Sequence, residues 1–196
     1  MDFYYYIRFP FNDREWFKKL GIGSIVFLIP IINIIAIGYF VQCIRLGAKG
    51  RRILPFWHNW EGLLRDGIIA IIISLAYIIP PCLLWPLFLA VPVIGIFMQS
   101  TIFLIAGLMI PMAVANYAVT DEIIDAFKLG RILGQLGEVL NDYVVIYLIM
   151  VIINSIFIAL IFALPILALL GAIVNFYLGV IFANFIGQLF RNTTCK

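Results

Sequence analysis

Four basic side chains that follow an apolar stretch are the most distinctive charged feature of the sequence. They are Arg45, Lys49, Arg51 and Arg52. Clustered cations fix the orientation of a membrane protein through the positive-inside rule. They also bind anionic lipid headgroups, with about 1 kcal/mol for each charge near the surface. The cluster is therefore a candidate headgroup-binding site, with orientation as its simpler role.

Uncharged polar side chains within or near apolar stretches are the second candidate group. Those singled out are Asn33, Gln99, Asn154 and Asn175. Hydrogen bonds between membrane helices, worth about 0.6 kcal/mol each on average, are their simplest role. Alternatively, they line a polar path for a small solute. Asn154 and Asn175 fall at similar depths in two neighbouring stretches, so the sequence predicts that they can meet.

Catalytic and metal-binding groups are not evident in the sequence. Charged residues lie outside the interior of the later apolar stretches, although a proton-coupled carrier or a membrane protease needs them there. His58 is the only histidine, and the three cysteines have no CxxC spacing. We therefore expect a protein that is not an enzyme and has no catalytic residue, cofactor or metal.

Composition places the chain in the membrane. It has 196 residues, of which 65% are hydrophobic and 12% charged, whereas soluble domains average about 45–50% apolar and about 25% charged residues. A net charge of +3 is too small to indicate a nucleic-acid partner. It suits contact with a bilayer that contains anionic lipids.

Apolar stretches of the length that a membrane helix needs, about 20 residues, define the expected fold. Four of them are predicted to span the bilayer: 67–90, 93–118, 143–164 and 166–190. Backbone groups within hydrocarbon must be satisfied internally, so these segments should be helices. We predict one all-α integral membrane domain over residues 1–196. Pro80 and Pro81 are expected to break the stretch 67–90 near its far end and to act as a hinge.

A further apolar stretch, 20–44, contains Pro30 near its middle, where we expect a second hinge. If the stretch crosses the bilayer, the positively charged N-terminus lies outside. If it enters and returns, all 13 Lys and Arg residues lie on one side. Each arm would then be about 15 Å long, half the thickness of the hydrocarbon core. The charge distribution favours the re-entrant hairpin, and a kinked full span remains the alternative.

Two amphipathic segments, 12–20 and 121–140, are predicted to be helices that lie in the membrane interface. The uncharged connections between the later spans contrast with charged segments elsewhere. The positive-inside rule therefore predicts a multi-pass protein of the cell membrane with its charged loops and C-terminus in the cytoplasm.

Several short motifs, in a characteristic order and spacing, resemble a known family. They are Phe9–Phe11, Leu28–Asn33, Leu54–Trp57 and Ala126–Gly130. Over roughly residues 8–150 the chain resembles the archaeal and bacterial membrane-protein family catalogued as domain of unknown function 4013. The resemblance implies a prokaryotic membrane protein of several helices. It implies no activity, substrate or catalytic residue.

The interfacial segments and the possible re-entrant hairpin favour one function. We expect a protein that organises or shapes the membrane or serves as a scaffold for partner proteins, and a homo-oligomer would suit this role. The alternative is a small transporter or channel for a neutral or lipidic solute, with its path lined by the four polar residues named above.

Overall fold

The computed structural model describes residues 8–51, 53–89, 91–163 and 168–194. Within these ranges the chain is helical and contains no strand, which confirms the all-α prediction. The elements are η1 (Phe9–Asn12), α2 (Trp16–Leu28), α3 (Asn33–Ala48), α4 (Trp60–Leu89), α5 (Pro92–Thr120), η2 (Ile123–Phe127), α6 (Leu129–Ala163) and α7 (Ala168–Thr194).

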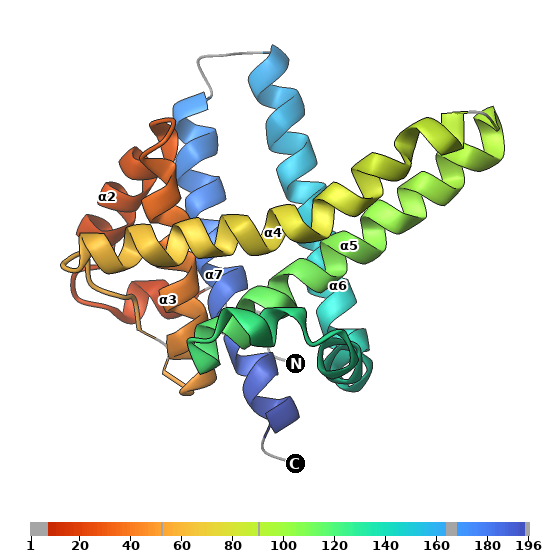
Figure 1. Cartoon of the computed structure of the whole chain (residues 1–196). Helices are drawn as coiled ribbons and strands as arrows, with labels where there is room; N and C mark the ends of the chain where they lie inside the picture. The colour runs from red at the N-terminus through yellow and green to blue at the C-terminus, as the bar shows by residue number, and fades with distance from the viewer. Residues whose placement is uncertain (1–7, 52, 90, 164–167, 195–196) are drawn as a thin grey trace.

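Four helices, α4 to α7, are long and apolar enough to cross a membrane. This confirms the four predicted spans and fits a multi-pass membrane protein. The helices form two hairpins, α4–α5 and α6–α7, which diverge from the centre of the molecule (Figure 1). Both hairpins meet α3, so α3 and the helices around it form the core.

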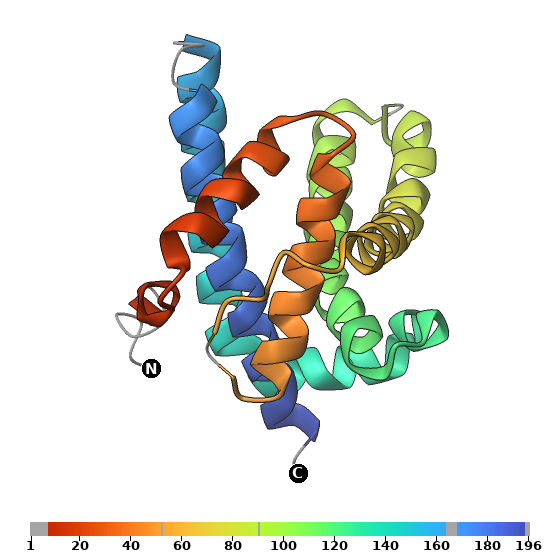
Figure 2. The ribbon, with the colours of Figure 1, turned by 90° about the vertical axis from the view of Figure 1, so that its left-hand side faces the viewer.

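The beginnings of two helices differ from the prediction. α4 begins at Trp60 rather than at residue 67, so a charged turn belongs to the helix. The predicted interfacial helix 121–140 is not a separate helix, because it divides into η2 and the first turns of α6. Figure 2 shows these turns running sideways before α6 rises. The apolar spacing of α6 continues from Ile132 to Tyr143, both of which are buried. The sequence pattern therefore has no break at residue 140 that would end the helix.

Prolines do not end the long helices. α4 continues through Pro80, Pro81 and Pro86 up to Leu89, contrary to the expected break. A membrane helix tolerates proline, and the Gln99 amide of α5 ties this part of α4 to α5 by donating to the Pro81 carbonyl at 2.8 Å. A hinge movement at Pro80 and Pro81 stays a prediction.

The stretch 20–44 folds as two helices rather than one. α2 rises to a turn at residues 29–32, which contains Pro30, and α3 descends from it (Figure 2). Ile31 has a φ of 74°, an unusual backbone conformation for a β-branched residue. The predicted helix 12–20 starts only at Trp16 and continues to Leu28, so it is the first arm of this hairpin.

Close backbone contacts hold α3 against α4. Gly38 of α3 lies against the Leu63 carbonyl of α4, and Gly67 of α4 lies against the Ile34 carbonyl of α3. A Cβ atom at either glycine would overlap the facing carbonyl. Small residues that let two backbones approach are typical of packing between membrane helices.

The same arrangement joins α3 to α7. Gly47 of α3 lies against the backbone of Asn184, and Gly187 of α7 lies against the Ile44 carbonyl. α3 is therefore fixed by a pair of glycine contacts on each of two sides. This packing positions the polar groups at the C-terminal end of α3.

Candidate functional site

A buried carboxylate, Asp66, lies in the second turn of α4 with only 2% of its surface exposed. The Arg45 guanidinium of α3 donates to both of its oxygens. The Tyr117 hydroxyl of α5 donates at 2.8 Å and the Gln42 amide of α3 at 3.0 Å. One carboxylate thus collects hydrogen bonds from two neighbouring helices.

Arg45 extends this network to the end of α5. Its Nε donates to the Ala118 carbonyl at 2.8 Å, and its Nη2 donates to Asp121 at 2.8 Å. Arg65 of α4 also reaches Asp121, at 3.3 Å. Arg45 therefore satisfies an end carbonyl of α5 and bridges two carboxylates. Because the Asp66 carboxylate is buried, the loss of one of these partners would be strongly destabilising.

A polar cavity of about 340 Å³ lies beside the network. Its charged lining consists of Arg45, Lys49, Arg65 and Asp121. Arg45 already forms ion pairs with Asp66 and Asp121. The cationic groups that a ligand in this cavity could contact are therefore the ammonium of Lys49 and the exposed edge of Arg65.

The predicted basic cluster is divided by the fold. Arg45 is only 19% exposed at its side chain and pairs with Asp66, so most of it is occupied within the protein, and its binding to lipid headgroups stays a prediction. Lys49 and Arg51 are exposed, and their binding to lipid stays a prediction. Arg52 lies outside the described residues. Arg45 differs from its neighbours in sequence because it forms a buried ion pair with Asp66, and a local sequence pattern does not reveal such pairing.

A second buried ion pair ties the start of α2 to the loop before α4. Lys19, 4% exposed, contacts Asp13 at 2.7 Å and donates to the Leu54 carbonyl at 3.1 Å. Its ammonium lies 3.8 Å from the centre of the Phe56 ring. Burial acts to raise the pKa of Asp13, but the hydrogen bond from Lys19, the backbone N–H of Glu15 and the charge of Lys19 together outweigh burial and lower the pKa. The base of the α2–α3 hairpin is thus anchored.

The four uncharged candidates are not brought together by hydrogen bonds among the described residues. Asn154 donates to Met150 of its own helix at 2.8 Å, and the side-chain oxygen of Asn175 is buried without a hydrogen-bond partner. These contacts do not join the two residues, and their meeting stays a prediction. Gln99 is buried against α4, and Asn33 begins α3.

Two other amide contacts, which the sequence did not single out, connect helices and loops. Asn116 of α5 and Gln135 of α6 form a buried pair at 2.7 Å. Asn184 of α7 donates to the Arg51 carbonyl at 3.1 Å and accepts from Gln188 at 2.6 Å. Both contacts suit the simpler role of polar groups as links between helices.

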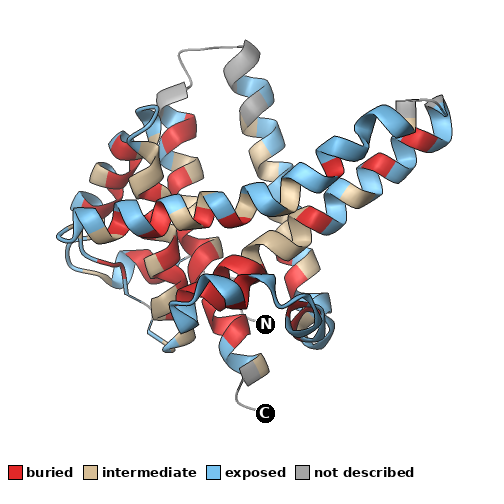
Figure 3. Ribbon diagram, viewed as in Figure 1, coloured by how far each residue is buried: buried red, intermediate tan, exposed pale blue. Residues whose placement is uncertain are grey.

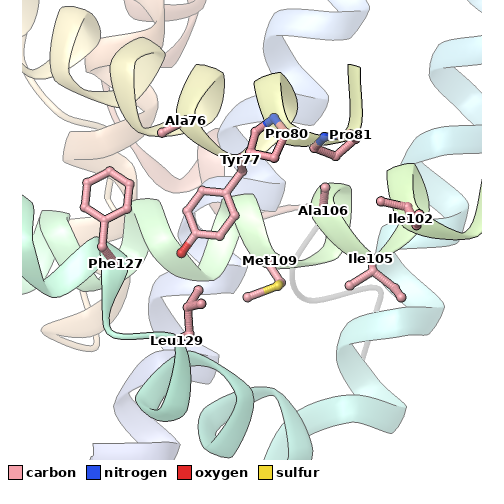
Figure 4. A pocket seen from close by; sticks show the side chains of 10 residues that line it. All are labelled: Ala76, Tyr77, Pro80, Pro81, Ile102, Ile105, Ala106, Met109, Phe127 and Leu129. Carbon is pink, nitrogen blue, oxygen red and sulfur yellow. The ribbon is translucent and has the colours of Figure 1, made fainter. Parts of the chain in front are cut away.

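An apolar cavity of about 380 Å³ lies between α4, α5, η2 and the start of α6 (Figure 4). Tyr77 crosses it and donates to the Ala126 carbonyl at 2.7 Å, which fixes η2 to α4. Asp125 of η2 pairs with Lys128 and Arg131. These two cations hold the pKa of Asp125 below its ordinary value, and the hydrogen bond from Lys128 makes the largest contribution.

Comparisons with known proteins identify a family. The family model described as "Protein of unknown function (DUF4013)" matches residues 22–167. No curated protein and no solved structure matches the chain. The match begins within α2 and covers α3, α4 and α5, the helices that hold the Asp66 network. Because it extends over most of the sequence, the chain belongs to the DUF4013 family.

Proposed function

We propose that this chain is a non-enzymatic membrane protein that organises or shapes the bilayer by holding a short helical hairpin in one leaflet. The observation that carries the proposal is the apolar, exposed tip of α2–α3. Ile31 is 81% exposed, and its neighbours Leu28, Ile29 and Ile32 are exposed as well. Water does not favour such a tip, whereas hydrocarbon does.

The lengths of the two arms support this position. α2 has 13 residues and α3 has 16, so the arms are about 20 Å and 24 Å long. Both are shorter than the hydrocarbon core, which is about 30 Å thick. The far ends of the arms carry buried ion pairs, Lys19 with Asp13 and Arg45 with Asp66. A hairpin with a charged base and an apolar tip suits entry from one side and return to it.

The remaining helices are consistent with a hairpin that occupies one leaflet only. α4 to α7 anchor the chain, and the far half of the α4–α5 hairpin presents mostly exposed side chains (Figure 3). Volume added to one leaflet alone expands that leaflet relative to the other and favours curvature. We propose that the hairpin base, the charged loops and the C-terminus face the cytoplasm, in line with the positive-inside rule.

A charge at the tip tests this proposal. We expect the wild-type protein to change the diameter and shape of reconstituted liposomes, and Ile31→Asp to abolish the change. A central aspartate costs a membrane helix about 2.5–3.5 kcal/mol on insertion scales. Ile53→Asp, at an exposed loop position, is the matched control and should behave as wild type. Electron cryomicroscopy of liposomes at equal protein content measures the effect.

Two outcomes would count against the proposal. One is a wild-type protein that leaves liposome shape unchanged. The other is Ile31→Asp protein that reconstitutes as well as wild type and changes the liposomes to the same extent.

Transport of a small solute has weaker support. Asn33, Gln99, Asn154 and Asn175 line neither the polar cavity beside Asp66 nor the apolar cavity between α4 and α5. Solute flux in proteoliposomes that disappears when Gln99 and Asn175 are replaced by leucine would favour transport over the membrane-organising role.

A further inference from the structure

An open apolar groove of about 480 Å³ runs between α2 and α7. Phe17, Leu20 and Gly21 line it from α2, and Ile173 and Tyr177 line it from α7. Phe17 is 76% exposed, although it is a large aromatic residue. No atom lies within 4 Å of the place where a Cβ of Gly21 would stand. The described residues therefore leave open space beside Gly21 in this groove.

An exposed cation of α2, Lys18, neighbours the groove but does not line it. Lys18 precedes Gly21 by three residues, so the two side-chain positions are neighbours on one helix face. Lys18 is exposed and has no ion-pair partner among the described residues. Arg14 is exposed nearby in sequence, and Glu15 balances one of the two cations. One net positive charge thus lies beside an apolar channel.

From this juxtaposition we infer that the α2–α7 groove binds an anionic phospholipid, with one acyl chain against Gly21 and the phosphate at Lys18. The inference rests on the proposed function, because α2 must lie in the leaflet for lipid to enter. The inference adds to the proposed function the class of lipid that binds to the hairpin. An acyl chain matches the apolar lining, and the phosphate matches the unpaired ammonium. A soluble anion would use only the second feature.

Filling the groove tests the inference. Native mass spectrometry of the detergent-solubilised protein, titrated with phosphatidylglycerol and phosphatidylcholine of equal chain length, measures lipid binding. We expect Gly21→Leu to reduce phosphatidylglycerol binding about tenfold, because the new side chain occupies the channel. Gly137→Leu is the matched control, since Gly137 of α6 is also helical and open. It should bind lipid like wild type.

Removing the charge tests the headgroup contact. Lys18→Gln should reduce phosphatidylglycerol binding about fivefold and leave phosphatidylcholine binding unchanged, so the preference between the two lipids falls. Glycerol 3-phosphate without acyl chains should not displace the bound phospholipid. Displacement by this soluble anion would overturn the inference in favour of a simple phosphate site.

The remaining outcomes separate the inference from the proposed function. Unchanged phosphatidylglycerol binding by folded Gly21→Leu protein would overturn the inference, while the liposome effect of Ile31 would be unaffected. A change of oligomeric state in Gly21→Leu, without loss of lipid binding, would also overturn it and assign the groove to a second copy. If Ile31→Asp had no effect on liposomes but Gly21→Leu abolished lipid binding, the proposed shaping of the bilayer would fail, whereas the lipid site, which needs only α2 in the leaflet, would stand.

Discussion

Gly67→Ala should destabilise the protein by about 3 kcal/mol, although alanine is the better helix former. The added Cβ would overlap the Ile34 carbonyl of α3. Overpacking in a tight core typically costs about 1–3 kcal/mol, and here the obstacle is backbone rather than a flexible side chain. α3 cannot retreat easily, because Gly47 and Gly187 fix it against α7. Thermal unfolding in detergent micelles measures the loss.

Gly137→Ala provides a control with the opposite sign. Gly137 is in α6, and no neighbouring atom lies within 4 Å of its Cβ position. The substitution should stabilise the helix by about 0.5–1 kcal/mol through propensity alone. If both substitutions raised the unfolding temperature, the close crossing of α3 and α4 would be wrong.

Arg45→Met should destabilise the protein by about 3–5 kcal/mol, the usual cost of removing one partner of a buried ion pair. Asp66 would then keep the hydrogen bonds from Tyr117 and Gln42 but lose its cation. The Ala118 carbonyl at the end of α5 would also lose its donor. The same micellar unfolding measurement applies.

Two further variants separate burial from charge. Arg65→Met removes a cation that is 63% exposed at its side chain and should cost no more than about 1 kcal/mol. The double variant Arg45→Met with Asp66→Leu removes both buried charges and should recover most of the stability lost by Arg45→Met alone. Equal losses for Arg45→Met and Arg65→Met would contradict the buried network.

The helices were predictable where the signal is local. Length and hydropathy within each stretch indicated four spans, because a bilayer core sets the minimum length. Where α4 begins was not predictable, since Arg65 and Asp66 resemble loop residues in sequence. Arg65 pairs with Asp121 and Asp66 pairs with Arg45, which lets both charges belong to the helix.

The polar network was predicted only in part, because it joins residues far apart in the chain. Arg45 was identified as important but assigned to lipid, and Asp66, 21 residues later, was missed. The only sequence feature that could have drawn attention to Asp66 is its position as a carboxylate directly before Gly67 and a long apolar run. This feature gives no indication of the residues that Asp66 pairs with. Glycines raise the same difficulty. Gly67 and Gly137 look alike in sequence, and only the crossing of α3 and α4 distinguishes them.

The position of the α2–α3 hairpin in one leaflet is the central claim, and cysteine accessibility tests it most directly. In a background without Cys43, Cys82 and Cys195, the variants Arg14→Cys, Ile31→Cys and Lys49→Cys are exposed in sealed vesicles to a membrane-impermeant maleimide. We predict that positions 14 and 49 are labelled from the same side, and that position 31 is labelled from neither side. Labelling of positions 14 and 49 from opposite sides would contradict the account, because the stretch would then cross the bilayer.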